Sequence, residues 1–543
     1  MNGITRIDDQ RSHAWIGVIV TILVFLVGAK IPFFAPDSWS YLELSNHIFD
    51  DFYRINTVRQ YVVDTPYGQS FPPLWPVLIA SIRNFVDLGI YSGVVLNLVI
   101  CLCLLAVLIR IARRLEQPPW VGTAIYLGML TCTSFADDVL AARNCALSIL
   151  FLALALLCSV SPQFARDSRH RIRSAALVGI WMGLACMNRF DAILLAAAFG
   201  LLIVLVQRNL VSAIIYFCAL ALVISPWIIY CKSHFGSWWI SDNTRQVFAA
   251  RDAFVMNYYQ DAAPRDLFDH PTSWVQGLIA DKIPKSWKGI IYCAIHSVTL
   301  ELLAVVLVLK AGRRSNCDGT TRHLGLWCLL LAPFVVIPPT LVGYGDERCF
   351  LPLQLFTLII LLSSLVAMTK QSWQRARVLM LLGVLSIAVI PADGIPWLIL
   401  HRSALSPSQW LTAHRKPTKE MQQLAEAVEH EAGGTWNRLL VYSPYRSKKP
   451  NDALEKSPQS QVFWNAFDPD GWAEWEYGAL TGRQVAVMPR VKSGSFETFL
   501  RDWRITHIYD GLGAGPVVDL AKVRLVPLSV TGLYRVEFRS PEK

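Results

Sequence analysis

The sequence has 543 residues, of which 54% are hydrophobic and only 17% are charged. That balance excludes an ordinary soluble enzyme and indicates a chain that crosses a membrane many times. The formal net charge of +10 would suit nucleic acid, but the Lys and Arg residues gather in short segments between apolar runs, which is a topology pattern. We therefore expect membrane lipids, and no nucleic acid, as partners.

Apolar runs of about twenty residues predict about eleven membrane-spanning helices within a membrane domain of residues 1–400. The first run lacks a small-residue cleavage site and is followed by more spans, so we interpret it as a retained anchor. The fold class is a polytopic α-helical membrane protein. The predicted spans are centred on 14–34, 90–109, 119–135, 139–159, 174–188, 190–207, 210–230, 287–309, 324–342, 349–368 and 376–398.

Basic residues mark every second loop, for example Arg113 and Arg114, then Arg171 and Arg173. By the positive-inside rule, the N-terminus is cytoplasmic and the tail after the last span is extracytoplasmic. The compact single-chain plan indicates the inner (plasma) membrane of a bacterium. Twelve cysteines lie mostly in apolar runs, which favours buried thiols over a disulfide framework or a zinc site.

Two outer loops are long, 35–88 and 231–286. In the first, residues 72–80 are too few to cross a bilayer and too apolar for water. They predict an interfacial helix on the outer leaflet with Trp75 at headgroup depth. The second loop mixes charge with aromatic residues such as Trp274, which suit either sugar stacking or anchoring of the loop.

After residue 400 the composition becomes that of a soluble protein, which predicts an extracytoplasmic α/β domain over 401–543. Helical periodicity covers 417–431 and 496–503. Alternating apolar residues predict strands at 439–442, 485–488, 505–509, 523–528 and 532–538.

Ionisable residues collect at the outer ends of the predicted spans. Asp37 directly follows the first span, where a carboxylate is costly unless it has a task. The other candidates come from four further turns: Asp137 and Asp138 before span four, Arg189 and Asp191 between spans five and six, Lys232 after span seven, and Tyr344, Glu347 and Arg348 before span ten.

This set of side chains suits transfer of a sugar from a polyprenyl-phosphate carrier. Such a donor has a good leaving group, so it needs cations to hold the phosphate, and Arg189 and Arg348 are available. An acceptor hydroxyl needs a carboxylate base, which Asp37 can supply. No cofactor is required, although a divalent cation held by Asp37 with Asp137 or Asp138 is compatible with the chemistry of oxygen ligands.

Short blocks of sequence resemble the GT-C membrane glycosyltransferases, in particular the protein O-mannosyltransferase and aminoarabinose transferase branch. The blocks are Pro36–Leu42 (PDSWSYL), Phe71–Pro76 (FPPLWP), Asn188–Asp191 (NRFD), Ser225–Gly236 and Tyr344–Pro352 (YGDERCFLP). The resemblance implies an inverting transferase whose catalytic domain is 1–400 and whose outer loops 35–88 and 231–286 form the site.

By the same resemblance, Asp37 is the catalytic aspartate of the first loop, and Asp137 or Asp138 matches the acidic position of the second. Tyr41, Arg189, Asp191, Lys232, Tyr344, Glu347 and Arg348 are the substrate-binding candidates. Ser38 stands where protein mannosyltransferases tend to carry Glu. The acceptor therefore stays open among glycan, lipid and protein.

Other interpretations of the same residues remain open. Asp37, Asp137 and Asp138 are also suited to capping helices, and Arg189 and Arg348 to reaching the outer headgroups. A transporter or flippase for a lipid-linked or anionic substrate would also use charged groups in a membrane bundle, but would carry them near the midplane, where Glu301 is the main example here. A non-catalytic scaffold acting through the C-terminal domain is a third alternative.

Overall fold

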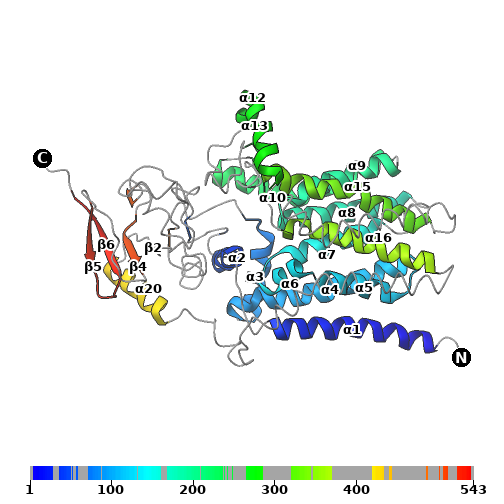
Figure 1. The fold of residues 1–543 in the computed structure, drawn as a ribbon, viewed down its shortest axis with the longest axis horizontal. Helices are drawn as coiled ribbons and strands as arrows, with labels where there is room; N and C mark the ends of the chain where they lie inside the picture. The colour runs from blue at the N-terminus through cyan, green and yellow to red at the C-terminus, as the bar shows by residue number, and fades with distance from the viewer. Residues whose placement is uncertain are drawn as a thin grey trace.

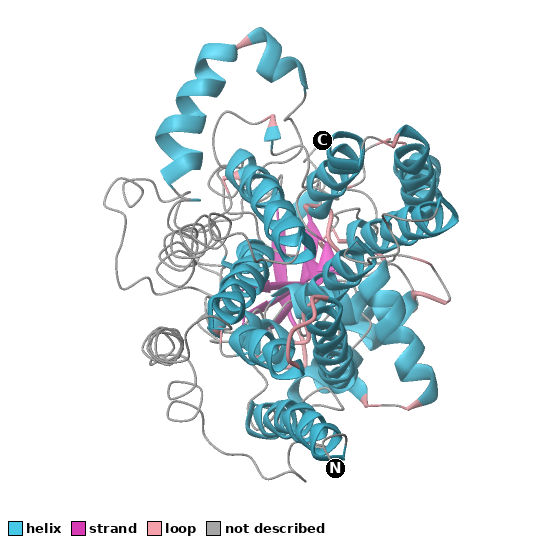
Figure 2. Ribbon diagram, turned by 90° about the vertical axis from the view of Figure 1, so that its right-hand side faces the viewer, coloured by secondary structure: helices cyan, strands magenta, loops and turns pink. Residues whose placement is uncertain are grey.

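The computed structural model describes residues 4–28, 36–49, 52, 57–58, 71–86, 88–130, 132–159, 168–207, 209–236, 238, 241, 247–248, 264–284, 286, 319–343, 347–369, 419–432, 439–442, 485–486, 500–501, 505–510 and 523–539. Long helices lie side by side at one end of the molecule, and a β-sheet lies at the other (Figure 1). The chain begins at the far end of the helices and finishes beside the sheet. Seen end-on, the helices form a bundle in front of the strands (Figure 2).

Helices occur at nine of the predicted span positions. They are α1 (Ile4–Gly28), α4 (Ser92–Arg114), α5 (Pro119–Leu130), α7 (Cys145–Ser159), α8 (Ser168–Asn188), α9 (Ala192–Gln207), α10 (Leu210–Phe235), α15 (Gly319–Val342) and α16 (Leu351–Thr369). The predicted spans 287–309 and 376–398 lie outside the described residues.

Length and composition alone qualify three of the described helices, α4, α10 and α15, to cross a membrane. A fourth span results if the bent pair α6 (Thr133–Leu140) and α7 is counted as one, and the other apolar helices are shorter. The fold is thus mostly helical and fits a polytopic membrane protein. The total of eleven spans stays a prediction.

Small residues bring α8 and α10 into close contact. Gly179 and Gly183 lie four residues apart on α8, and a side chain at Gly179 would clash with the carbonyl oxygen of Tyr216 on α10. At Gly183 an added Cβ would lie 2.7 Å from Cβ of Val223. Because lipid tails are as apolar as leucine, close backbone packing of this kind is a main source of helix association in membranes.

One predicted span is not continuous. The apolar run 139–159 predicts a single helix, but α6 ends at Leu140 and α7 begins at Cys145 with a bend of 114°. Ala142 has a positive φ of 56°, which no helix interior allows, and polar side chains from four other helices bind the turn. The prediction was wrong here because apolar composition does not reveal a helix break whose backbone N–H and C=O groups are hydrogen-bonded by residues distant in the sequence.

The first outer loop contains two helices, α2 (Pro36–His47) and α3 (Leu74–Phe85). A helix at 72–80 is therefore confirmed, but the placement of Trp75 at the headgroups is wrong. Its side chain is fully buried, and its Nε1 donates a hydrogen bond to the carbonyl oxygen of Ala142 at 2.9 Å. The indole N–H finds its polar partner in the turn between α6 and α7 rather than in the lipid headgroups.

The sheet has six strands in the order β1-β3-β2-β4-β6-β5. The strands are β1 (Thr57–Val58), β2 (Leu439–Tyr442), β3 (Val485–Ala486), β4 (His507–Asp510), β5 (Val523–Pro527) and β6 (Leu533–Phe538). The first four pair in parallel, and β6 pairs antiparallel with β4 and β5. Helix α20 (Lys419–Ala432) packs Leu424 and Val428 against Leu439 and Leu533.

Strand β1 belongs to the first outer loop, which the sequence did not indicate. Thr57 and Val58 pair with Val485 and Ala486, more than four hundred residues away in the chain. The loop that carries α2 is therefore tied to the sheet by backbone hydrogen bonds. Two residues give too little periodicity to predict a strand.

We expect the sheet to lose stability in mild acid through His507. This side chain is 2% exposed, and burial lowers the pKa of His507, an effect that nearby Glu431 opposes and Arg535 reinforces. Its stabilising effect is complete above the unfolded pKa of about 6.5 and is lost as pH falls toward the lower folded value. Amide exchange of β4, corrected for the intrinsic pH effect, should speed up below pH ~6, and His507→Gln should abolish that change. A pH dependence unaltered in the variant would contradict the assignment.

Candidate functional site

Three of the predicted residues form a charged cluster at the end of the bundle that faces the sheet. Arg348 Nη1 lies 2.9 Å from Asp37 Oδ2 and 4.0 Å from Asp138 Oδ1. Asp37 is on the first turn of α2, Asp138 on α6, and Arg348 in the short 3-10 helix η5 (Glu347–Phe350). The side chains are 35%, 0% and 12% exposed respectively, so the cluster runs from a buried acid to an acid that meets solvent.

A second ion pair lies in the turn between α8 and α9. Arg189 donates from Nη2 to Asp191 Oδ2 at 2.7 Å and from Nε to Asp191 Oδ1 at 3.1 Å, a two-pronged geometry that fixes the plane of the guanidinium. Its Nη1 and Nη2 also donate to the sulfur atoms of Cys145 and Cys349, at 2.9 and 3.4 Å. Cys349 directly follows Arg348, so the two arginine side chains approach the same region from different helices.

The turn between α6 and α7 is held by buried polar side chains. Ser38 on α2 donates to the carbonyl oxygen of Ala141, while Asn97 on α4 donates to those of Val139 and Arg143 at 3.0 and 2.9 Å. Asp138 Oδ2 accepts the N–H of Cys145, the first residue of α7, at 2.8 Å. The buried carboxylate thereby caps α7 and also faces Arg348, and its assignment to the site stays a prediction.

A reciprocal amide pair joins this turn to the Arg189 turn. Asn144 and Asn188 each donate from Nδ2 to the other's backbone carbonyl oxygen, and Asn188 also donates to Ser148 Oγ at 2.7 Å. Both asparagines are buried. The two turns that carry Asp138 and Arg189 are therefore fixed relative to one another, which gives the charged groups a preorganised geometry.

Tyr41 lies one turn after Asp37 on α2 and is buried, with its ring edge-on to Phe71 at 5.4 Å between centroids. Burial, and after it the charge of Asp37, raises the pKa of Tyr41 well above its ordinary value. The hydroxyl therefore stays protonated at neutral pH. It can donate a hydrogen bond near the cluster but cannot serve as a base.

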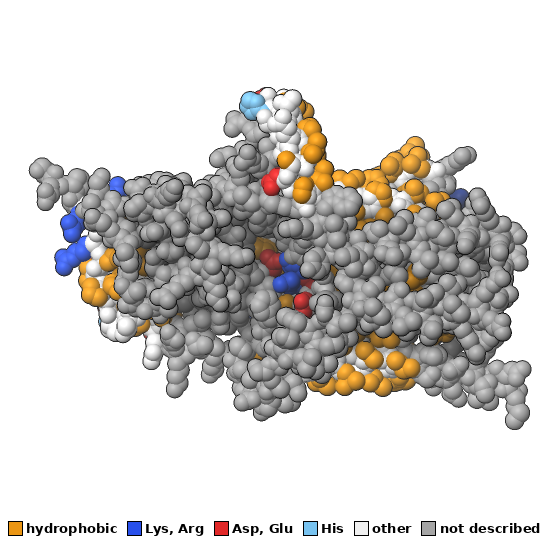
Figure 3. Space-filling view, in the orientation of Figure 1, with side chains coloured by type: hydrophobic (Ala, Val, Ile, Leu, Met, Phe, Trp, Pro, Cys, Tyr) orange, Lys and Arg blue, Asp and Glu red, His pale blue; other side chains and the backbone are white. Residues whose placement is uncertain are grey.

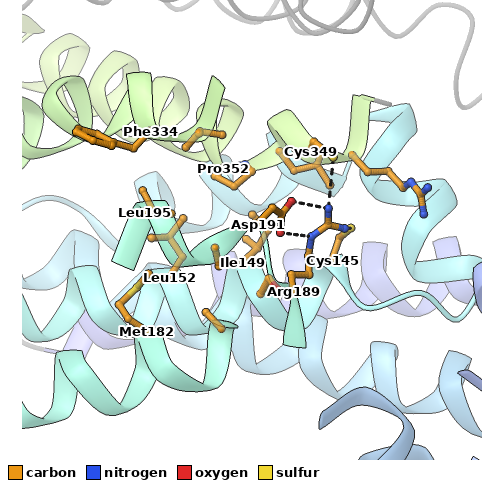
Figure 4. A pocket seen from close by; sticks show the side chains of 16 residues that line it. Cys145, Ile149, Leu152, Met182, Arg189, Asp191, Leu195, Phe334, Cys349 and Pro352 are labelled. Carbon is orange, nitrogen blue, oxygen red and sulfur yellow. Dashed lines mark hydrogen bonds and ion pairs between the residues drawn. The ribbon is translucent and has the colours of Figure 1, made fainter. Parts of the chain in front are cut away.

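A pocket lies beside these ion pairs. Arg189, Asp191, Arg348, Cys145 and Cys349 form its polar end, and Figure 4 shows the guanidinium of Arg189 between Asp191 and the two cysteines. The remaining wall is apolar and comes from α7, α8, α9, α15 and α16, including Leu152, Met182, Leu195, Phe334 and Pro352. The pocket thus has a polar end, which contains two arginines and one aspartate, and an apolar end within one hollow between helices.

The surface shows acidic and basic side chains together in the middle of the molecule, between the bundle and the sheet (Figure 3). Among the described residues, apolar side chains are most extensive on the bundle and on the helical segment 264–284, with a smaller group at the sheet.

The other predicted residues have different places. Asp137 is the neighbour of Asp138 on α6, and its backbone carbonyl accepts the N–H of Ala141 at 2.8 Å. Lys232, at the end of α10, donates to the carbonyl oxygen of Gly236 at 3.0 Å and lies 5.5 Å from the ring centre of Trp238. Only the backbone of Glu347 is described, within η5, and Tyr344 is outside the described residues.

Several residues of the site escaped prediction. Ser38, Asn97, Asn144, Asn188 and Trp75 bind backbone groups of the two turns, and Cys145 and Cys349 contact Arg189. The signal available in the sequence was the presence of Ser and Asn inside or beside apolar runs, since such residues in a membrane protein need polar partners. The thiols carried no signal because buried cysteine is common as a small hydrophobe.

Replacing Trp75 with phenylalanine should lower the stability of the bundle by about 1 kcal/mol. The smaller phenyl ring would leave part of the buried space empty, and the Ala142 carbonyl would lose the indole N–H that binds it. Thermal unfolding in detergent should show a reduced melting temperature. The matched control is Trp15→Phe on the exposed face of α1, which should leave it unchanged, and equal melting temperatures for the two variants would contradict the proposed clamp.

No protein-family profile matches the sequence, and no curated protein matches it. Solved structures do match. The oligosaccharyltransferase AglB from Archaeoglobus fulgidus, in complex with an inhibitory peptide and a dolichol-phosphate, has a TM-score of 0.53 at 10% identity, covering 91% of this chain and 69% of AglB. The A. fulgidus oligosaccharyltransferase in complex with Zn and sulfate has a TM-score of 0.53 at 11% identity, covering 90% and 67%.

A third match is ArnT from Cupriavidus metallidurans bound to undecaprenyl phosphate, with a TM-score of 0.47 and 13% identity over 97% of this chain and 99% of ArnT. The conclusion on fold rests on the AglB comparison, whose score is higher. The resemblance of the sequence to the GT-C glycosyltransferases is thus confirmed at the level of fold: the chain has the fold of a membrane oligosaccharyltransferase.

Proposed function

We propose that the chain is an integral membrane glycosyltransferase that moves a sugar from a polyprenyl-phosphate donor to a hydroxyl acceptor on the extracytoplasmic face, with inversion. The observation that carries this proposal is the pocket in which Arg189 and Arg348 share one polar end while Arg348 also pairs with Asp37. Among the structures with similar folds, one holds a dolichol-phosphate and another an undecaprenyl phosphate.

The donor lipid suits both ends of the pocket. Its phosphate would meet the guanidinium groups of Arg189 and Arg348, which form charge-assisted hydrogen bonds with phosphate oxygens. Its polyprenyl chain would lie along the apolar wall between α7, α8, α9, α15 and α16, where the bilayer can reach it. When the bond to the sugar breaks, negative charge grows on the phosphate, and the two fixed cations stabilise that charge.

Asp37 pairs with Arg348, which lines the pocket, and is the more exposed acid of the cluster. We assign it as the general base that takes the proton from the acceptor hydroxyl as the oxygen attacks the anomeric carbon. A phosphate on Arg348 would compete with Asp37 for the guanidinium and so leave the carboxylate free to accept that proton. Asp138, buried and held by the Cys145 amide, keeps Arg348 in position.

We also propose that five further residues bind the substrate: Tyr41, Asp191, Lys232, Tyr344 and Glu347. Tyr41 is a neutral hydrogen-bond donor next to Asp37, and Asp191 orients Arg189. The acceptor is a hydroxyl of a glycan, a lipid or a protein. The proposed location is a bacterial inner membrane with a cytoplasmic N-terminus and the C-terminal domain outside.

The test is bond formation by purified protein in detergent micelles, where no sealed compartment exists. Radiolabelled polyprenyl-phosphate sugar should be converted to free polyprenyl phosphate plus a glycosylated acceptor, with the anomeric configuration inverted. Acceptors are drawn from envelope glycans, lipids and proteins of a deletion strain. If no donor of this class is consumed with any acceptor fraction, the proposed function is wrong.

A transporter or flippase is the alternative, and one observation favours it. The pair α6 and α7 is a broken helix with a bend of 114°, a feature that transporters use to bind polar substrates inside a membrane. Such a protein would move the lipid-linked substrate between the leaflets of sealed vesicles and leave its sugar–phosphate bond intact. Turnover in micelles distinguishes the two functions, because transport has no product there.

Chelation of divalent metal is expected to leave sugar transfer unchanged. Arg348 Nη1 lies between the carboxylates of Asp37 and Asp138, and the described residues contain no group of three or more His, Cys, Asp and Glu side chains able to hold a metal. As they stand, these residues do not fit a cation shared by the two acids. The measurement is the transfer rate after treatment with EDTA. If EDTA abolishes transfer and one added divalent metal restores it, a cation displaces Arg348 from its position between the two carboxylates.

A further inference from the structure

We infer that the helical segment 264–284 is an anchor that lies flat on the membrane surface and binds phospholipid acyl chains with its apolar face. The segment consists of α12 (Pro264–Asp269), α13 (Pro271–Gly277) and the π-helical turn η4 (Leu278–Lys282), and we call it the interfacial arm. The inference does not depend on the proposed transfer reaction.

The arm presents large apolar side chains to its surroundings on one face only. Phe268, Val275 and Ile279 are 76%, 45% and 61% exposed. Val275 and Ile279 are four residues apart and lie on the same side of the helical segment that follows His270. Phe268 lies on α12 before that residue. Ser273 lies on the opposite side and is exposed as well. A helix this short with three bare apolar residues on one face is unfavourable in water and suited to the boundary between headgroups and acyl chains.

The arm runs in the direction expected for a helix that lies at the boundary between headgroups and acyl chains. It stands out sideways from the end of the bundle nearest the sheet, crosswise to the long helices (Figure 1). The space-filling view shows a continuous apolar stripe on the side of the arm that faces along the bundle, with acidic and histidine side chains on its other side (Figure 3). If the long helices cross the bilayer, the stripe faces the acyl chains and the polar side faces water.

The helices of the bundle expose apolar side chains as well as the arm does. On α10, Leu222 and Ile229 are 74% and 62% exposed, and α1 exposes a similar row that includes Trp15 and Leu26. Exposed apolar belts of this kind on membrane-spanning helices contact lipid. The same lipid is therefore the partner that fits the apolar face of the arm.

The base of the arm is fixed to the wall of the pocket. The side chain of Lys282 is fully buried, and its Nζ donates to the carbonyl oxygen of Leu341 at 2.7 Å, next to the end of α15. Ser286 donates to the carbonyl oxygen of Pro339 at 3.1 Å. A lysine ammonium suits the negative end of a helix dipole. Since α15 also supplies Phe334 and Val335 to the pocket, the arm couples the membrane surface to the helix that lines the apolar end.

The sequence left open whether the aromatic residues of loop 231–286 stack on sugar or anchor the loop. Trp274 is part of the attachment: its Nε1 donates to the carbonyl oxygen of Val247 at 2.9 Å, and Lys282 Nζ lies 5.8 Å from its ring centre. On the arm, Phe268 faces outward.

The test uses wild-type full-length protein in vesicles of phosphatidylethanolamine and phosphatidylglycerol that contain a phosphatidylcholine with a diazirine in its acyl chain. After illumination, mass spectrometry should find lipid adducts at Phe268, Val275 and Ile279 and none at Ser273. Adducts at Leu222 of α10 serve as the internal standard. The double variant F268S/I279S should lose adducts on the arm several-fold and keep those at Leu222.

Each other outcome overturns the inference. If α10 is labelled and the arm is not, the arm does not reach the acyl chains. If Ser273 is labelled as strongly as Phe268, no face of the arm is selected by the membrane. If arm residues are recovered mainly in links to a second copy of the chain, the apolar face is a protein interface.

Discussion

Replacing Asp37 with asparagine is expected to lower the rate of sugar transfer by about 10² to 10⁴-fold, the usual contribution of a general base. The amide keeps the size and the hydrogen-bonding oxygen of the carboxylate but cannot take the acceptor's proton. Because the side chain is about one third exposed, the bundle should tolerate the change. The measurement is kcat with saturating donor and acceptor, since a base acts on the chemical step.

Removing the charge of Asp37 also removes a partner of Arg348, so donor binding has to be measured beside the rate. The Kd for polyprenyl phosphate should stay the same or become smaller in Asp37→Asn, because one carboxylate no longer competes with the phosphate for the guanidinium. The matched control is Asp269→Asn, an exposed acid of the arm, which should keep the full rate. A variant Asp37→Asn with the wild-type rate would remove the assigned base and leave the fold assignment intact.

Replacing Arg348 with glutamine should damage both binding and stability. Loss of a charge-assisted hydrogen bond to phosphate weakens donor binding by about 1.5 to 3 kcal/mol, or roughly 10- to 100-fold in Kd. Asp138, fully buried and 4.0 Å from Arg348 Nη1, would lose one of the cationic groups that stabilise its carboxylate, Arg143 being another, so the bundle should also lose stability. Thermal unfolding and donor binding, both in detergent, measure the two effects separately.

A double variant separates the two roles of Arg348. Adding Asp138→Asn removes the buried carboxylate that has lost Arg348 as a neighbour, while its amide oxygen can still accept the N–H of Cys145. Stability should largely return, and donor binding should not. If donor binding also returns to the wild-type value, Arg348 serves only to neutralise Asp138 and has no part in holding phosphate.

Parts of this site were visible in the sequence because topology alone brings them together. Asp37 and Arg348 are 311 positions apart, yet each directly flanks an apolar run, and the alternation of basic loops places both at the same ends of their helices. The alternation of apolar residues was also enough to predict strand β2 and the last two strands, β5 and β6. Each of these strands is about as long as the apolar run that predicts it.

The features that escaped prediction depend on partners that no local pattern contains. The break at 141–144 lies within a predicted apolar span and exists because Ser38, Trp75 and Asn97 satisfy its backbone groups. Strand β1 is two residues long and is defined by β3 rather than by its own sequence. Trp75 was assigned to the headgroups because composition reports apolarity and cannot tell a lipid contact from a buried one.

The central claim is that one pocket holds the donor phosphate between Arg189 and Arg348 with Asp37 at its edge. It is tested most directly by an experimental structure of the protein with bound polyprenyl phosphate. The account predicts phosphate oxygens within hydrogen-bonding distance of both guanidinium groups and the prenyl chain along Leu152, Met182 and Phe334. A phosphate bound outside this pocket, with Arg348 still paired to Asp37, would contradict the central claim.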